Sequence, residues 1–143
     1  MGSNPTPSAR GHRLFICKAN AGRSQMSQAL FDRAAAGRHR ALSAGSEADP
    51  GGHVHPPVVA AMRELGIDLS ARRPQPLTRD LAQQADVVVT MGCGDACPYI
   101  PGKRYVDWDL PDPKDRPLDE VRATRDEIAR RVKQLVAELG ERS

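Results

Sequence analysis

One cysteine and one arginine stand at a spacing that suits the binding and attack of an oxyanion. Cys17 ends a short apolar run, and Arg23 follows six positions later at the predicted start of a helix. Backbone N–H groups in a tight loop that leads into a helix N-terminus converge on one point, where they favour a tetrahedral anion. The guanidinium adds two parallel donors, and the same positive field favours the thiolate form of the cysteine. The segment from Cys17 to Ser24 is therefore predicted to hold an oxyanion above a thiolate nucleophile.

The other residues of this loop complete the predicted anion-binding set. The set is Lys18, Ala19, Asn20, Ala21, Gly22, Arg23 and Ser24. The Ser24 hydroxyl is placed to donate to the cysteine sulfur, and Asn20 to hold the loop through side-chain to backbone hydrogen bonds. A bare Cys-x5-Arg pattern also fits a buried structural cysteine ahead of an ordinary helix. The preceding strand, the internal glycine and the serine after the arginine together favour the catalytic interpretation.

The strands and helices that must position this loop alternate along the chain. Strands are predicted at 14–16, 39–45, 87–89 and 104–106, and helices at 24–36, 56–65, 78–84 and 118–139. Thr78 is predicted to cap its helix, and Gly37, Gly66 and Gly140 to end the three others. The pattern predicts one α/β domain, a four-stranded parallel sheet flanked by helices on both faces.

Length and composition limit the class of protein. A chain of 143 residues has room for one core, so we expect a disordered N-terminal tail over residues 1–11 and a single catalytic domain over 12–143. No apolar run reaches the roughly 20 residues of a bilayer span, and we see no secretory signal. We therefore expect a cytoplasmic protein with no membrane partner. The net charge of +3 is spread along the chain, so no nucleic-acid partner is predicted.

Two further cysteines stand four positions apart, shortly after the predicted strand 87–89. They are Cys93 and Cys97, and an odd total of three cysteines argues against a closed set of structural disulfides. Loops that follow parallel strands open onto the same edge of a sheet, so Cys93 is expected to approach Cys17. A zinc site needs about four ligands and only scattered histidines accompany the pair, so no metal is predicted. The pattern favours redox exchange over two idle thiols.

Taken together, these motifs resemble the arsenate reductases that share the low-molecular-weight protein tyrosine phosphatase fold. The residues that carry the resemblance are Cys17-x-x-Asn20-x-x-Arg23-Ser24-Gln25-Met26, Ser43-Ala44-Gly45, Val87-Val88-Val89-Thr90-Met91, Cys97-Pro98, Trp108, Asp112-Pro113, Val121-Arg122 and Arg125-Asp126-Glu127-Ile128. They cover nearly the whole chain after His12, and they are specific as a set rather than singly. The resemblance implies an oxidoreductase of arsenic detoxification.

The resemblance also implies which residue is the catalytic acid. Attack on arsenate or on a phosphate ester expels an oxygen that a positioned carboxylic acid can protonate. Spacing alone does not choose among the neighbouring candidates Asp107, Asp109, Asp112 and Asp115. The family's acid belongs to an Asp-Pro pair, which implies Asp112, and Pro113 restricts the backbone around it.

For the three thiols the resemblance implies a relay. Cys17 attacks arsenate, Cys93 attacks Cys17 and releases arsenite, and Cys97 then moves the disulfide to the Cys93–Cys97 pair, where thioredoxin reduces it. The implied partners are arsenate, with phosphate or sulfate as mimics, and thioredoxin, with no bound cofactor. The spacing of Cys93 and Cys97 is shorter than in the best-known thioredoxin-coupled members. Because Cα atoms more than about 7 Å apart cannot be bridged, we expect the segment 92–98 to shift during turnover.

Other functions remain open at this point. A low-molecular-weight protein tyrosine phosphatase would use Cys17, Arg23 and Asp112 alone, but such enzymes commonly carry tyrosines after the Asp-Pro, where this chain has Lys114. A mycothiol-coupled arsenate reductase would leave the second pair of cysteines spare. A binding module that only captures an oxyanion would need the loop and nothing else.

Some members of the family also bind a potassium ion through two acidic residues. At the corresponding positions this chain has Gln28 and Gln75. Hard cations prefer carboxylate and carbonyl oxygens, so the loss of both charges predicts that no comparable potassium site exists here.

Overall fold

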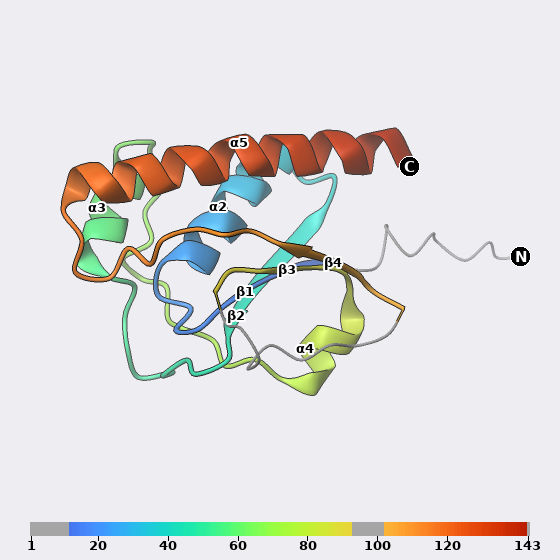
Figure 1. The fold of residues 1–143 in the computed structure, drawn as a ribbon, viewed down its shortest axis with the longest axis horizontal. Helices are drawn as coiled ribbons and strands as arrows, with labels where there is room; N and C mark the ends of the chain where they lie inside the picture. Colours follow the sequence, from blue (N-terminus) through green and yellow to red (C-terminus); the bar gives the residue numbers. More distant parts are fainter. Residues whose placement is uncertain (1–11, 93–101, 143) are drawn as a thin grey trace, which may run out of the picture.

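The predicted alternation of strands and helices is present in a computed structural model, which describes residues 12–92 and 102–142 (Figure 1). In chain order the elements are β1 (His12–Cys17), α2 (Arg23–Ala35), β2 (Arg40–Gly45), α3 (Pro56–Arg63), α4 (Arg79–Gln84), β3 (Ala85–Thr90), β4 (Arg104–Asp107) and α5 (Leu118–Arg142). Thr78 caps α4 as predicted, because its hydroxyl accepts from the N–H of Leu81 at 3.1 Å.

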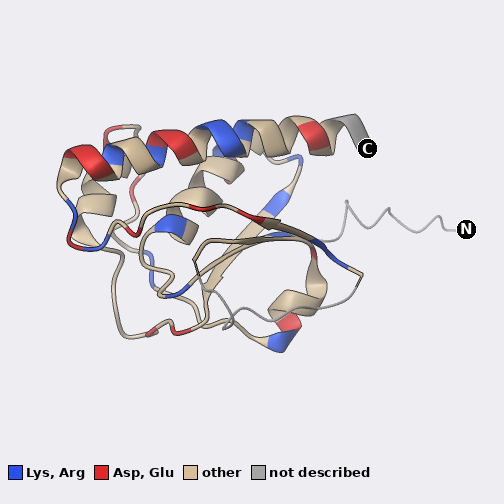
Figure 2. Ribbon diagram, in the orientation of Figure 1, with Lys and Arg blue, Asp and Glu red and all other residues tan. Residues whose placement is uncertain are grey.

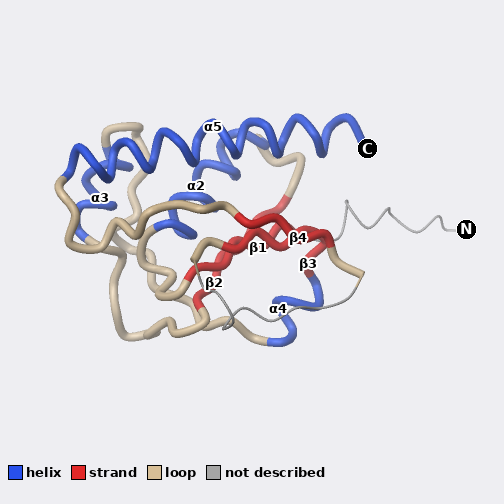
Figure 3. Tube along the Cα trace, in the orientation of Figure 1, coloured by secondary structure: helices blue, strands red, loops and turns tan. Residues whose placement is uncertain are grey.

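The four strands form one parallel sheet in the order β2-β1-β3-β4, as predicted. The register places Cys17 opposite Gly45 of β2, and Ile16 opposite Thr90 of β3. The carboxyl ends of three neighbouring strands therefore meet at one edge of the sheet, where the loops after β1 and β3 face the same space. Figure 3 shows this sheet lying between the helices.

Helices cover both faces of the sheet, which gives three layers (Figure 1). Successive side chains of a strand point to opposite faces. In β1, Phe15 packs in the larger core under α2, α3 and α5, whereas Leu14 and Ile16 pack in the smaller core with Ala82 of α4. Full burial of such an apolar side chain contributes about 1.5–3 kcal/mol. The second half of β1, from Leu14 on, is apolar on both faces for this reason, and it carries Cys17 on a rigid support.

Three predicted helix ends are wrong. Helix α3 ends at Arg63, with Glu64 as its C-cap, before the predicted Gly66. The left-handed residue that ends α2 is Ala36, with φ of 50°, and its N–H donates to Asp32 O. Gly37 follows it with φ of 84°. The last helix does not stop at Gly140 but continues to Arg142. One glycine inside a helix costs only about 1 kcal/mol, which the apolar stripe of α5 offsets by packing on the core.

Residues of both charges follow one another along α5 (Figure 2). Glu127, for example, accepts from the Nε of Arg131 one turn away at 2.7 Å. None of the helices within 12–92 and 102–142 is long and apolar enough to cross a membrane.

Candidate active site

Cys17 is the last residue of β1, and its sulfur lies at the base of the loop that follows. The residue is 2% exposed. Its Sγ accepts a hydrogen bond from the Asn20 N–H at 3.2 Å and lies 2.9 Å from the Ser24 hydroxyl. Two polar groups of the loop therefore contact the sulfur, and both are able to donate a hydrogen bond to it.

Asn20 holds the shape of the loop. Its backbone adopts the left-handed conformation with φ of 54°, which asparagine tolerates better than most residues. Its amide nitrogen donates to Ser24 Oγ at 2.7 Å, and its Oδ1 accepts from the N–H of Gln75 at 2.7 Å. Because the Ser24 oxygen already accepts from Asn20, its own hydrogen is free to point at Cys17 Sγ.

Gly45 allows β2 to pass close beneath the loop. A Cβ atom at this position would lie 2.7 Å from Lys18 O and 2.9 Å from the nitrogen of Asn20. The loop carbonyls therefore turn toward β2, where the N–H of Glu47 donates to Lys18 O and that of Ser46 to Cys17 O. These hydrogen bonds tie the loop to the segment that directly follows β2.

Arg23 begins α2 and reaches across the carboxyl edge of the sheet. Its side chain is largely buried, its Nη1 donates to Leu110 O at 3.1 Å, and its Nη2 lies 3.8 Å from Asp112 Oδ2. Its Nε is buried without a hydrogen-bond partner among the described residues. Gly92 fits against the guanidinium, since a Cβ there would meet Nη1 at 2.6 Å. The guanidinium is thus fixed in place and keeps one donor unused.

Asp112 brings a carboxylate to the same cavity from a loop after β4. Its Oδ1 accepts from the backbone N–H of Lys114 at 3.0 Å, and its side chain is 58% exposed. This local hydrogen bond fixes the carboxylate beside Arg23 while solvent still reaches it.

The cavity between these groups has a volume of about 220 Å³. It is lined by Cys17, Lys18, Ala19, Ala21, Gly22, Arg23, Glu47, His55, Asp112 and Lys114. Burial lowers the pKa of His55, an effect that the charge of Asp112 opposes and that of Lys114 reinforces. The wall beside the thiol thus carries a neutral imidazole at neutral pH, and the positive charges of the cavity are those of Lys18, Arg23 and Lys114.

No role in the site was predicted from the sequence for Gln25 or for His55. Gln25 is buried behind the loop, and its Nε2 donates to Asn20 O, to Asn20 Oδ1 and to Arg73 O. A glutamine directly after the Arg-Ser pair is its only signal in the sequence. His55 lies at the cavity because its backbone N–H donates to Ala21 O at 2.9 Å. This is a long-range contact that no local pattern in the sequence indicates.

The predicted relay residues Cys93 and Cys97 lie outside the described residues, so the structure gives no distance from either sulfur to Cys17. The described part of the chain contains no group of three or more His, Cys, Asp or Glu side chains that could hold a metal ion.

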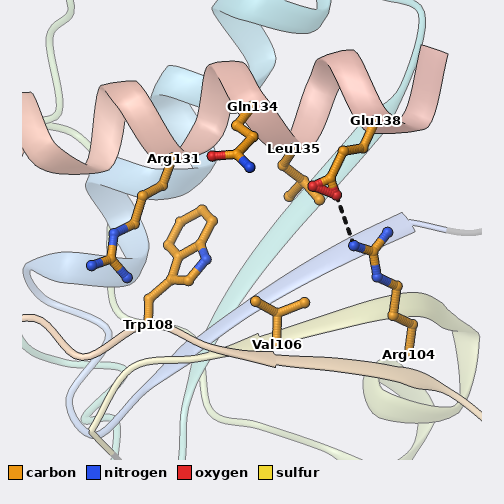
Figure 4. A pocket seen from close by; sticks show the side chains of 7 residues that line it. All are labelled: Arg104, Val106, Trp108, Arg131, Gln134, Leu135 and Glu138. Carbon is orange, nitrogen blue, oxygen red and sulfur yellow. Dashed lines mark hydrogen bonds and ion pairs between the residues drawn. The ribbon is translucent and has the colours of Figure 1, made fainter. Parts of the chain in front are cut away.

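A second cavity, of about 250 Å³, lies between β4 and α5 (Figure 4). It is lined by Arg104, Val106, Trp108, Arg131, Gln134, Leu135 and Glu138. An ion pair at 2.9 Å between Arg104 and Glu138 closes one end. On its other side the indole of Trp108 packs on Phe15 of β1, with the ring centroids 5.7 Å apart. None of these lining side chains is a nucleophile, so the chemistry belongs to the cavity at Cys17.

A parallel sheet that ends in a cysteine loop, with an arginine and an aspartate facing the same cavity, defines a protein of the phosphatase-like, cysteine-loop class. The chain belongs to the low molecular weight phosphotyrosine protein phosphatase family, whose model matches residues 12–143. This confirms the fold predicted from the sequence.

Two similar proteins are both named as arsenate reductases. The chain is 34% identical over 129 residues to a glutaredoxin arsenate reductase of Synechocystis, covering 88% of this chain and 96% of the relative. It is 39% identical to a putative arsenate reductase of Halobacterium salinarum, covering 87% and 89%.

The similar solved structures include both a reductase and a phosphatase. A thioredoxin-dependent arsenate reductase of Corynebacterium glutamicum superimposes with a TM-score of 0.77 and 38% identity. That alignment covers 93% of this chain but only 63% of the other. An arginine phosphatase of Geobacillus stearothermophilus gives a TM-score of 0.80 at 25% identity, covering 92% and 94%. The fold alone therefore does not separate a reductase from a phosphatase.

Proposed function

We propose that this protein reduces arsenate to arsenite. The observation that carries the proposal is the convergence on one small cavity of a buried cysteine sulfur with two donors, a fixed guanidinium and an aspartate. The names of the similar reductases from Synechocystis and Halobacterium salinarum support the choice of arsenate.

In the first step the Cys17 thiolate attacks arsenic, and a sulfur–arsenic bond forms as an arsenic–oxygen bond breaks. The loop N–H groups and the guanidinium of Arg23, which lines the cavity, hold the remaining oxygens, whose negative charge they offset. Asp112, in its protonated form, gives the proton to the leaving oxygen, which departs as water, and Asp112 is left as a carboxylate beside Arg23. Arsenic is still pentavalent in this adduct.

In the second step Cys93 attacks the Cys17 sulfur. The sulfur–sulfur bond forms, the sulfur–arsenic bond breaks, and its electron pair stays on arsenic, which leaves as arsenite. Two electrons have then passed from the two thiols to arsenic. Cys97 attacks Cys93 in turn, and the resulting Cys93–Cys97 disulfide is reduced by a dithiol of the thioredoxin class, with thiol–disulfide exchange at each step. We place this cycle in the cytoplasm, where such reductants are maintained.

The walls of the cavity favour a small free oxyanion over a phosphotyrosine. Among the described lining residues the only aromatic ring is the imidazole of His55. A phosphotyrosine phosphatase needs an apolar wall for the ring of its substrate. The lysines Lys18 and Lys114 line the cavity instead, and they suit a compact dianion.

The test is consumption of NADPH on addition of arsenate, coupled through thioredoxin and thioredoxin reductase. We expect turnover by the wild type and none by Cys17→Ser. The same assay run with glutaredoxin and glutathione, or with a mycothiol system, identifies the reductant. Hydrolysis of p-nitrophenyl phosphate without any reduction of arsenate would instead establish a phosphatase.

A single turnover without reductant tests the relay itself. Wild type and Cys97→Ser should each release about one arsenite per chain, with the disulfide at Cys93–Cys97 in the wild type and at Cys17–Cys93 in the variant. Cys93→Ser should release none. Full release of arsenite by Cys93→Ser would overturn the relay while leaving arsenate reduction intact.

A further inference from the structure

Arg72 binds a side chain of α2 from outside the cavity. It lies in the segment between α3 and α4, is half-buried, and its Nη2 donates to Gln28 Oε1 at 2.7 Å. Ser43 of β2 donates to the same oxygen, also at 2.7 Å. Burial raises the pKa of the carboxyl of Asp32, one turn further along α2, and the positive charge of Arg72 partly offsets this effect. The guanidinium of Arg72 thus binds α2 at the point where α2, β2 and the segment between α3 and α4 meet.

The residues just after Arg72 contact the loop that holds the thiol. Arg73 O accepts from Gln25 Nε2 at 3.1 Å, and the Gln75 N–H donates to Asn20 Oδ1 at 2.7 Å. From Asn20 the hydrogen bonds continue to Ser24 and from there to Cys17 Sγ. Because Arg72 anchors the segment from which these contacts come, its position affects the two donors at the sulfur.

The donor set here does not fit a potassium ion, although related proteins bind one through carboxylates. Gln28 is neutral, and its oxygen already accepts two hydrogen bonds. Asn20 Oδ1 likewise accepts from Gln75 N–H and Gln25 Nε2. Among the described residues the one buried unpartnered amide oxygen, Gln25 Oε1, offers a single neutral ligand, whereas hard cations take several oxygens. The guanidinium of Arg72 would also repel a second cation.

We infer that Arg72 is a positioning residue: a cation tethered to the chain that holds the segment 72–75 against α2 and so keeps Asn20 and Ser24 in place at Cys17. It makes a bound potassium ion unnecessary. The inference rests on the proposed reactivity of Cys17, but it does not depend on the identity of the oxyanion.

The test compares four full-length proteins: wild type, Arg72→Met, Arg72→Lys and Arg63→Met. The Arg63 side chain pairs with Asp68 on the exposed surface at 3.5 Å. Arg63→Met therefore removes the same charge away from the segment 72–75 and is the matched control. The first readout is the pH profile of iodoacetamide alkylation at Cys17, followed on its own peptide by mass spectrometry. The second is kcat and KM for arsenate in potassium chloride and in sodium chloride at equal ionic strength.

We expect the alkylation profile of Arg72→Met to move to higher pH, and kcat to fall about tenfold with a smaller change in KM. Arg72→Lys keeps the charge and should retain most of the wild-type behaviour, and Arg63→Met should match the wild type. Rates in the two salts should be equal. If Arg72→Met does not fold, Arg72→Lys and the salt comparison decide.

Equal alkylation profiles in Arg72→Met and Arg63→Met would overturn the inference. So would a loss in Arg72→Lys as large as that in Arg72→Met, or a several-fold activation of the wild type by potassium. Alkylation needs no arsenate. A wild type that reduces no arsenate would therefore refute the proposed function, and the profiles would still decide the role of Arg72.

Discussion

Pro113 packs directly on Gly22 at the entrance of the cavity. A Cβ atom at Gly22 would lie 2.7 Å from Cγ of Pro113 and 3.5 Å from Cδ2 of His55. The proline follows Asp112, so this contact sets the distance between the anion loop and the proposed acid. The glycine is required for the close approach of the two segments.

Gly22→Ala should therefore slow the reaction without unfolding the protein. The added methyl group forces the Asp112–Pro113 segment away from the loop, and a displacement of about 1 Å at a reacting group can reduce the rate about 100-fold. We expect kcat for arsenate to fall at least about tenfold. Gly51→Ala is the control, because its Cβ would meet only Asp49 Oδ1 at an ordinary 3.5 Å. Equal kcat values in the two variants would contradict this role for the contact.

Gly92 should determine the position of the arginine. Its φ is 80°, and a Cβ would meet Arg23 Nη1 at 2.6 Å. Arg23 is buried and donates to Leu110 O, so it cannot yield without losing that bond. We expect KM for arsenate to rise about tenfold in Gly92→Ala, as one charge-assisted contact is worth about 1.5–3 kcal/mol.

Gly66→Ala separates this effect from backbone strain. Gly66 has a similar φ of 79° with nothing within 4 Å of a Cβ, so it carries the same strain of about 1–2 kcal/mol without the clash. Its unfolding midpoint should fall while its KM stays at the wild-type value. A KM change of equal size in both variants would show that strain, and not Arg23, is responsible.

The fold and the loop from Cys17 to Ser24 were predictable because both depend on patterns of residues that are close together in the sequence. Apolar runs gave the strands, and Cys17 and Arg23 belong to one continuous segment. Asp112 comes from a distant loop, and only the resemblance to known reductases selected it from four aspartates. The need for Gly45 beneath the loop arises from the pairing of β1 with β2, which no local pattern reveals.

Contacts between residues far apart in the sequence escaped prediction for a similar reason. The partnership of Arg72 with Gln28 depends on how the segment after α3 returns to α2. The end of α5 was placed too early because the sequence shows the local cost of Gly140, while the packing that offsets this cost is tertiary.

Glu64 ties α3 to α5 and should make stability depend on pH in acid. Hydrogen bonds from Arg122 and then from Arg125 lower the pKa of Glu64 from 4.5 to about 2. The folded protein therefore keeps Glu64 ionised at a pH where the unfolded chain has taken up the proton. The stabilisation is complete above about pH 4.5 and is lost as pH falls toward about 2.

Glu64→Gln should consequently unfold at lower urea concentration than the wild type at neutral pH, and this difference should shrink between pH 4.5 and 2. Urea titrations at several pH values measure it. Glu120→Gln removes a carboxylate from an exposed pair with Arg116 at 3.8 Å, and such pairs contribute little. A Glu64→Gln difference that did not change with pH would rule out an electrostatic origin.

His55 should make anion binding depend on pH. Burial lowers the pKa of His55 from 6.5, the charge of Asp112 opposes the shift, and that of Lys114 adds to it. The imidazole is neutral at neutral pH and takes up a proton only as pH falls through this lowered value. The new positive charge then lies on the wall of the cavity that holds Cys17.

Sulfate is a suitable probe of this charge, because it remains a dianion throughout the range in which histidine titrates. Its inhibition constant should decrease more in the wild type than in His55→Asn as pH falls below 6.5, and we expect a difference of about threefold from one added charge at a partly solvated site. The variant shares every other titrating group, so the ratio of the two constants isolates His55. Inhibition constants with the same pH dependence in both proteins would show that the imidazole stays neutral or lies too far from the bound anion. A ratio of the two inhibition constants that changes as His55 takes up its proton would place His55 beside the bound oxyanion.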